Sequence, residues 1–221
     1  MEQARSKPAK REALTLTDQL RTRFKGILDP VGIILNRLGL MPNTITVLGL
    51  VGNMVAAVLI ATGKIQIGGL VVLMMGPVDA LDGTMARLRG MAGNFGAFVD
   101  SVTDRYSELV IHMGLLYYFV QKGNQVAVML VFASAAGSVL VSYVRARGQS
   151  LGWDTKTGIL TRLERYLVLA PALILNYPLV GLWILAVLSN VTAIQRIIDV
   201  RRQAYLKSSP VEDHRKTSGE K

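Results

Sequence analysis

Apolar runs about twenty residues long recur along this chain, and they constrain its fold more than any other feature. An α-helix needs about twenty apolar residues to cross roughly 30 Å of hydrocarbon. Of the 221 residues, 51% are apolar and the mean hydropathy is +0.37, which is more hydrophobic sequence than one soluble core can absorb. We therefore predict an all-α, polytopic membrane protein with six transmembrane helices. The runs lie at 44–62, 66–86, 95–120, 125–147, 160–177 and 179–199.

The basic residues indicate how such helices would be oriented. The chain carries 25 Lys and Arg against 15 Asp and Glu, a formal charge of +10. Six spans place both termini on one side of the membrane. The connections on the opposite side contain only two basic residues, Lys64 and Lys122. Because basic residues favour the cytoplasmic side, we predict that both termini lie in the cytoplasm. We also predict that the protein resides in the cytoplasmic membrane. This partition accounts for most of the charge without a nucleic-acid partner.

We divide the chain into three regions: a cytoplasmic N-terminal segment at 1–43, a six-helix transmembrane domain at 44–206, and a disordered cytoplasmic tail at 207–221. Residues 1–13 are also expected to be disordered. No early apolar h-region precedes the first run, so we expect no cleavable signal peptide. The absence of cysteine excludes a disulfide-stapled module.

Apolar residues also recur at helical spacing before the first run, between basic residues. This pattern predicts an amphipathic helix lying in the cytoplasmic interface of the membrane. Pro30 is expected to kink this helix or to begin a second one. The apolar positions are Leu20, Phe24, Ile27, Leu28, Val31, Ile34, Leu35 and Leu38.

Four carboxylates fall in the second and third runs: Asp79, Asp82, Asp100 and Asp104. Ionisable residues within membrane spans are rare and mark functional sites. The two residues of each pair are three or four apart, so each pair projects from one helix face. If the two helices are antiparallel neighbours, the four acids converge. Such an all-oxygen cluster repels itself unless a cation sits within it, and oxygen ligands favour Mg²⁺, Mn²⁺ or Ca²⁺. The alternative is that the acids form salt bridges with Arg87, Arg89 and Arg105.

The sequence from Asp79 to Asp104 reads DALDGTMARLRGMAGNFGAFVDSVTD. It matches D-x2-D-G-x2-A-R-x8-G-x3-D-x3-D at all eight specified positions, and on these residues the chain resembles the CDP-alcohol phosphotransferases, also called CDP-alcohol phosphatidyltransferases. The resemblance implies transfer of a phosphatidyl-type group from a CDP-linked lipid, CDP-diacylglycerol, to an alcohol with release of CMP. It implies two divalent ions, Mg²⁺ or Mn²⁺, held by Asp79, Asp82 and Asp100. Asp104 would also touch a metal and would act as the general base.

The resemblance also implies a nucleotide-binding set. Small residues would let the cytidine approach the backbone and Arg87 would meet phosphate, while the segment Pro42-Asn43-Thr44-Ile45-Thr46 resembles the family's entry to the first span. An alternative for this segment is a helix start with Asn43 or Thr44 as its N-cap. The implied nucleotide-binding residues are Asn43, Thr46, Asp79, Asp82, Gly83, Ala86, Arg87 and Gly96.

Arginines at the ends of the last three runs bear on the acceptor. A cluster of guanidinium groups suits a phosphorylated acceptor, because each binds phosphate through paired hydrogen bonds. The stretches SYVRAR and LERYLVL look most like the family branch of prokaryotic phosphatidylinositol phosphate synthases, so inositol 1-phosphate is the first expected acceptor. Arg145 replaces a Lys of that branch, which leaves glycerol 3-phosphate open. The expected acceptor-phosphate residues are Ser142, Arg145, Arg165 and Arg196.

Two other function classes fit part of the sequence. A small ion-coupled transporter would also use carboxylates within the membrane, and a basic membrane scaffold would not need them. The transporter does not account for the arginine cluster or for the D-G-x2-A-R context. Small residues on the third and fourth runs, including Gly114 and Gly137, could pack within the bundle or across the homodimer that is usual in the family.

Overall fold

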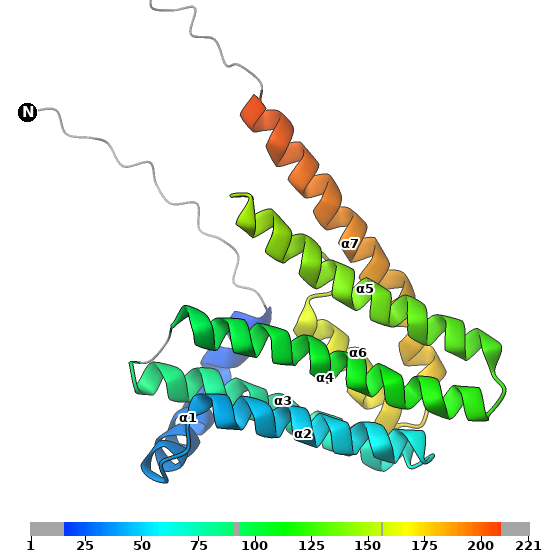
Figure 1. Cartoon of the computed structure of the whole chain (residues 1–221), viewed down its shortest axis with the longest axis horizontal. Helices are drawn as coiled ribbons and strands as arrows, with labels where there is room; N and C mark the ends of the chain where they lie inside the picture. The colour runs from blue at the N-terminus through cyan, green and yellow to red at the C-terminus, as the bar shows by residue number, and fades with distance from the viewer. Residues whose placement is uncertain (1–15, 91–92, 156, 209–221) are drawn as a thin grey trace, which may run out of the picture.

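The computed structural model describes residues 16–90, 93–155 and 157–208 of the chain, and within them the backbone forms seven α-helices and no β-strand (Figure 1). The disorder predicted for 1–13 and for most of the tail concerns residues outside this part. The helices are α1 (Leu16–Arg37), α2 (Pro42–Ala61), α3 (Ile65–Leu88), α4 (Asn94–Gln121), α5 (Gln125–Ser150), α6 (Arg162–Ile174) and α7 (Pro178–Ser208).

The helices α2 to α7 coincide with the six apolar runs. Among the described residues, four helices are long and apolar enough to cross a membrane: α2, α3, α5 and α7. Two of the helices α2 to α7 are too short or too charged to meet that description. The α6 helix has only 13 residues, and α4 carries Asp100, Asp104, Arg105 and Glu108 within its 28 residues. The structure therefore confirms an all-helical membrane protein, and six spans remain a prediction.

Helix ends follow local chemistry. The α2 helix begins at Pro42, whose fixed φ suits the first helical position. Its N-cap is Met41, without a side-chain cap, so the alternative of Asn43 or Thr44 as N-cap is wrong. The α7 helix continues through Ser208, past the boundary drawn at 206. Positive φ angles at Gly63 and Gly123 let the chain reverse between helices.

The N-terminal helix α1 confirms a helix before the first span. It runs unbroken through Pro30, so no second helix begins there. Ile27, Ile34 and Leu38 are 64%, 57% and 70% exposed, which leaves much of the apolar face uncovered by protein. The side chains of Leu20 and Phe24 lie outside the described part. An uncovered apolar face on this helix is what an interfacial position requires.

The bundle is held by close contacts at small residues. The α2 helix packs along both α3 and α4, α6 packs on α3 and α7, and α5 lies beside α7 (Figure 1). A Cβ at Gly114 of α4 would lie 2.5 Å from the carbonyl oxygen of Ala57 in α2, and one at Gly137 of α5 would lie 2.7 Å from the Asn190 side chain in α7. Both glycines therefore serve packing within the protomer. The largest fully buried apolar side chains include Ile60, Val72, Leu115, Leu173, Leu182 and Leu185.

Candidate active site

The four acids stand on two helices that both pack on α2. Asp79 and Asp82 belong to the C-terminal half of α3, and Asp100 and Asp104 to the N-terminal half of α4. The expectation that α3 and α4 would be direct neighbours needs correction, because each packs along α2 and neither packs along the other. Ala56 and Ala57 of α2 allow α3 and α4 to approach it closely. Because α3 and α4 do not pack along each other, a side chain from another helix can lie between the two acid pairs.

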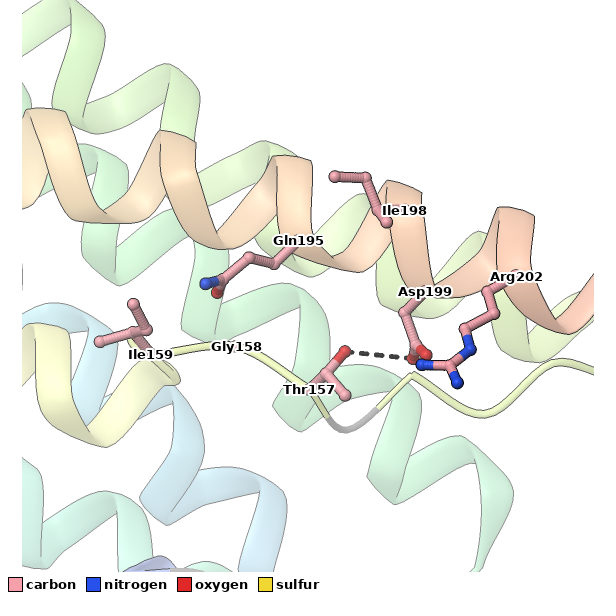
Figure 2. Close-up of a pocket in the computed structure, with 7 residues that line it drawn as sticks. All are labelled: Thr157, Gly158, Ile159, Gln195, Ile198, Asp199 and Arg202. Carbon is pink, nitrogen blue, oxygen red and sulfur yellow. Dashed lines mark hydrogen bonds between the residues drawn. The ribbon is translucent and has the colours of Figure 1, made fainter.

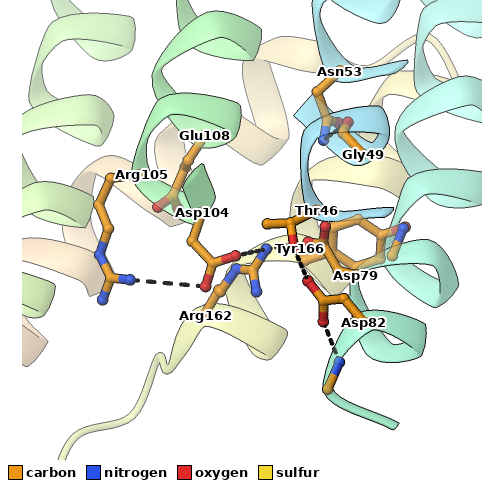
Figure 3. A network of polar contacts seen from close by, with 12 residues as sticks. Thr46, Gly49, Asn53, Asp79, Asp82, Asp104, Arg105, Glu108, Arg162 and Tyr166 are labelled. Carbon is orange, nitrogen blue, oxygen red and sulfur yellow. Dashed lines mark hydrogen bonds and ion pairs between the residues drawn. The ribbon is translucent and has the colours of Figure 1, made fainter. Parts of the chain in front are cut away.

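That side chain is Arg162, the first residue of α6 (Figure 3). Its Nη2 atom lies 2.6 Å from Asp104 Oδ1 and also contacts Asp79 Oδ2. One guanidinium thus joins carboxylates from α3 and α4. Arg105 adds a longer ion pair, with Nη1 3.7 Å from Asp104 Oδ2.

Asp82 is held differently and is only 5% exposed. The Thr46 hydroxyl of α2 donates to Asp82 Oδ2 at 2.5 Å, and the backbone N–H of Gly83 donates to Oδ1. Asp100 is half-buried and interacts electrostatically with Arg162, Asp79 and Arg105. All four acids therefore belong to one electrostatic cluster, in which Asp82 is fixed by neutral donors.

The alternative of salt bridges between the acids and Arg87 or Arg89 is wrong. Arg87 donates to the Thr84 hydroxyl at 2.9 Å, and Arg89 donates to the backbone carbonyl of Asn36 at 3.0 Å. Both arginines stand at the end of α3, one or two turns beyond the acids, where their side chains reach other partners. Only Arg105, of the three, pairs with one of the four acids.

The cluster suits a hard cation in its donors and charge. Within the described residues, no three His, Asp or Glu side chains are arranged as a ready set of metal ligands. Two carboxylate oxygens from different helices nevertheless meet on one cationic nitrogen of Arg162. The donors are all oxygen, as Mg²⁺ and Mn²⁺ prefer. The residues present thus fit a divalent ion that takes the place of the guanidinium between Asp79 and Asp104.

Local features of α2 and α3 place Asp79. A Cβ at Gly49 of α2 would lie 2.9 Å from Asp79 Oδ1, so glycine at that position makes room for the carboxylate. Pro77 has no N–H, which leaves the carbonyl of Leu73 without its helical donor. The Tyr166 hydroxyl of α6 lies 2.5 Å from that carbonyl oxygen and 2.7 Å from the one of Val72, and it accepts from the N–H of Gly76 at 3.1 Å.

The residues expected to bind the nucleotide differ in how far they are exposed. Thr46 is buried on Asp82, whereas Asn43 and Arg87 are exposed. Gly83, Ala86 and Gly96 are half-buried, and a Cβ at Gly96 would meet no atom within 4 Å. The structure brings Thr46 into direct contact with the acids.

The expected acceptor residues come from three helices. Ser142 and Arg145 are on α5, Arg165 is on α6 and Arg196 is on α7. Arg196 repels both Arg145 and Arg165, so the three charges are gathered in one place. Arg165 and Arg196 are each only 3% exposed, and Arg196 donates to the carbonyl oxygens of Val141 at 2.6 Å and Thr157 at 3.0 Å.

Beside this cluster a cavity of about 350 Å³ opens between α7 and the loop that connects α5 to α6 (Figure 2). The Thr157 hydroxyl donates to Asp199 across it at 3.1 Å. None of the four acids lines the cavity, so it is separate from the acidic cluster. Its lining is Thr157, Gly158, Ile159, Gln195, Ile198, Asp199 and Arg202.

Three residues of the site were not assigned to it from the sequence. Arg162 is one of several arginines at the ends of the last three helices, and nothing in the sequence links it to the acids. Glu108 forms a two-point ion pair with Arg165. Nothing in the sequence marks Tyr166 as part of the site. The spacing of Glu108, four residues after Asp104 on the same helix face, was the one available indication.

The sequence was compared with protein families and with curated proteins. The family model for CDP-alcohol phosphatidyltransferase matches residues 39–195. Phosphatidylinositol phosphate synthase from Mycobacteroides abscessus is 34% identical over 190 residues, which cover 82% of this chain and 86% of that protein. Archaetidylinositol phosphate synthase from Pyrococcus horikoshii is 31% identical over 189 residues, which cover 85% of this chain and 98% of that protein.

Solved structures give the same result. Phosphatidylinositol phosphate synthase from Mycobacterium tuberculosis with CDP-DAG bound superposes with a TM-score of 0.74 at 31% identity, covering 79% of this chain and 93% of that one. The same enzyme in complex with manganese and citrate gives a TM-score of 0.75 and covers 79% and 88%. The family match spans most of the chain, including the acidic signature and two arginines of the cluster, Arg145 and Arg165. This chain therefore belongs to the CDP-alcohol phosphatidyltransferase family.

Proposed function

We propose that this protein transfers the phosphatidyl group of CDP-diacylglycerol to inositol 1-phosphate, which yields phosphatidylinositol phosphate and CMP. The observation that carries the proposal is the juxtaposition of two clusters of opposite charge. Carboxylates of α3 and α4 meet around one cation position. The arginines of α5, α6 and α7 adjoin them through Arg165, which pairs with Glu108 one turn after Asp104. The first cluster suits a metal-bound pyrophosphate and the second suits a phosphorylated acceptor.

In this proposal Asp79, Asp82, Asp100 and Asp104 would hold two divalent ions, Mg²⁺ or Mn²⁺. Such ions neutralise the pyrophosphate and the leaving CMP. Asp104 accepts the proton of the acceptor hydroxyl. The oxygen of that hydroxyl forms a bond to the lipid-bearing phosphorus, and the bond from the phosphorus to the CMP oxygen breaks. The crystal structures of the mycobacterial enzyme with manganese and with CDP-DAG support a divalent metal and a CDP-linked lipid as ligands of this site.

The remaining residues of the expected site fit around this step. Thr46 fixes Asp82 through its hydroxyl, and we assign it with Asn43, Gly83, Ala86, Arg87 and Gly96 to the nucleotide. Half-buried small residues and the open space at Gly96 leave the backbone accessible to a ligand. Ser142, Arg145, Arg165 and Arg196 would take the acceptor phosphate. Glycerol 3-phosphate carries the same group, and the arginines alone do not distinguish the two acceptors.

We also propose six spans, with both termini and the site on the cytoplasmic side, as the distribution of Lys and Arg indicates. The acidic residues of α4 then face the site, while apolar side chains of the same helix such as Phe98 and Met113, which are 61% and 64% exposed, face the lipid. Membrane lipid and a second copy of the chain would cover exposed apolar side chains such as Met129 and Phe132 on α5, which are 67% and 69% exposed.

The test is release of CMP from labelled CDP-diacylglycerol by the purified protein, with inositol 1-phosphate, glycerol 3-phosphate, free inositol and serine offered separately. We expect turnover with inositol 1-phosphate that EDTA abolishes and that Mg²⁺ or Mn²⁺ restores. Turnover with glycerol 3-phosphate alone would replace the acceptor. Ion flux into vesicles without CMP release would refute the transferase, and unaltered function in an Asp104→Asn variant would favour a scaffold.

A further inference from the structure

A half-buried carboxylate outside the family signature contacts the arginine cluster. Glu108 of α4 lies one turn beyond Asp104 (Figure 3). Its Oε1 atom is 2.7 Å from Arg165 Nε and its Oε2 atom is 3.1 Å from Arg165 Nη2, so two parallel hydrogen bonds join the charged groups. The Ser138 hydroxyl of α5 donates to Oε1 at 2.7 Å. Helices α4, α5 and α6 thus meet at this carboxylate.

The pair fixes the orientation of Arg165. A guanidinium has five N–H donors in a rigid plane, and Glu108 engages the edge formed by Nε and Nη2. Nη1 lies 3.4 Å from the carbonyl oxygen of Leu160, which is a longer contact. Donors on the Nη atoms remain for a ligand, and their direction is set by the edge that Glu108 holds. A side chain 3% exposed has little freedom to choose another orientation.

Glu108 also balances charge. Arg196 is repelled by both Arg145 and Arg165. A carboxylate paired with Arg165 offsets one of these charges, so that Arg165 can be kept in the cluster before the acceptor arrives. His112 lies one turn further along α4. Its Nδ1 donates to the backbone carbonyl oxygen of Glu108 and its Nε2 is hydrogen-bonded to the Ser134 hydroxyl, both at 2.8 Å, which ties this part of α4 to α5.

We propose that Glu108 is a positioning residue that holds Arg165 in place for the phosphate of the acceptor. This inference rests on the proposed function, because it assumes that the arginines bind that phosphate. It assigns to the reaction a residue that does not touch either substrate. Since Glu108 acts through Arg165, its loss weakens binding of the acceptor and leaves binding of the CDP-linked lipid nearly unchanged.

The experiment is a double-mutant cycle on the purified full-length protein, with the variants Glu108→Gln, Arg165→Gln and the double variant E108Q/R165Q. Michaelis constants are measured for CDP-diacylglycerol and for the acceptor that the wild type uses. Loss of charge-assisted hydrogen bonds predicts that E108Q raises the acceptor constant roughly ten- to a hundredfold. The donor constant should change by less than about twofold. Because Glu108 acts through Arg165, the double variant should be no worse than R165Q alone.

Two further variants separate positioning from general effects of charge. Glu108→Asp keeps the carboxylate, and we expect an acceptor constant between those of the wild type and E108Q. Glu164→Gln removes a neighbouring negative charge that reaches Arg196 only through space, and we expect less than about a threefold change. The double variant also replaces both partners of the buried pair, so it avoids an uncompensated charge and should fold even if a single variant does not.

Multiplicative effects of E108Q and R165Q, equal changes for both substrates, or an equal effect of E164Q would each overturn the inference. Calorimetric binding of inorganic phosphate gives a readout that does not depend on the acceptor's identity, and E108Q should weaken it. If the wild type binds phosphate but turns over neither phosphorylated acceptor, the proposed function fails while this comparison still decides the role of Glu108.

Discussion

Replacing Tyr166 with phenylalanine removes one hydroxyl from the junction between α6 and α3. That hydroxyl lies 2.5 Å from the carbonyl oxygen of Leu73, which lacks a helical donor because Pro77 has no N–H. The N–H of Gly76 can return to its ordinary helical partner, so the substitution leaves one orphaned carbonyl. In a membrane no water replaces the lost donor. We expect a loss of about 1–3 kcal/mol in the free energy of unfolding.

The same substitution should slow the reaction. Asp79 lies two residues after Pro77, so relaxation of this part of α3 moves its carboxylate relative to Asp104. Misplacement of a reacting group by about 1 Å can cost about a hundredfold in rate, and we expect Tyr166→Phe to lower turnover roughly ten- to a hundredfold.

The measurements are thermal unfolding in detergent and CMP release at saturating substrates. A loss of about 2 kcal/mol corresponds to roughly 4–8 °C in melting temperature for a chain of this size. Tyr177→Phe is the matched control, since its side chain is 65% exposed and lies in the α6–α7 connection. A Tyr166→Phe protein that melts and turns over like the control would refute the reasoning about the proline break.

Three further predictions concern the acids. Asp104→Asn should reduce CMP release by several powers of ten, about 4 kcal/mol or more in activation free energy, while the melting temperature changes little; activity within tenfold of the wild type would contradict its role as base. Arg162→Gln removes the cation shared by Asp79 and Asp104, so its melting temperature should fall in EDTA and recover in Mg²⁺, whereas an equal fall in both solutions would count against a divalent ion at that position. Gly49→Ala places a Cβ 2.9 Å from Asp79 Oδ1, so turnover should fall about tenfold or more with little loss of solubility in detergent; unchanged turnover would show that Asp79 can shift freely.

The sequence was sufficient to predict the helices, because each apolar run is bounded by residues that end helices. Pro42 begins α2 and Gly63 and Gly123 turn the chain between helices, and these are local effects. It was also sufficient to predict that four acids belong to one site, since their spacing fixes the helix faces. Composition alone does not identify α4 as a membrane span, because α4 mixes apolar and charged residues.

The pairings across the bundle could not be predicted. Arg162 and Asp79 are 83 positions apart, and several other arginines were equally available in the sequence. Which one reaches the acids depends on α3 and α4 both packing on α2, a tertiary arrangement that hydropathy does not encode. The contact of Tyr166 with the carbonyl freed by Pro77 depends on the same packing of α6 on α3.

The two arginines of α6 at positions 162 and 165 stand one helical turn apart, a rise of about 5 Å. One faces the acids of α3 and α4, and the other faces Glu108 beside α5 and α7. In the proposed function, the first helices would hold the CDP-linked donor and the last ones would bind the phosphate of the acceptor. A single residue inserted between the two arginines would rotate one of them by about 100° around the helix axis relative to the other, so that both could no longer face their present partners.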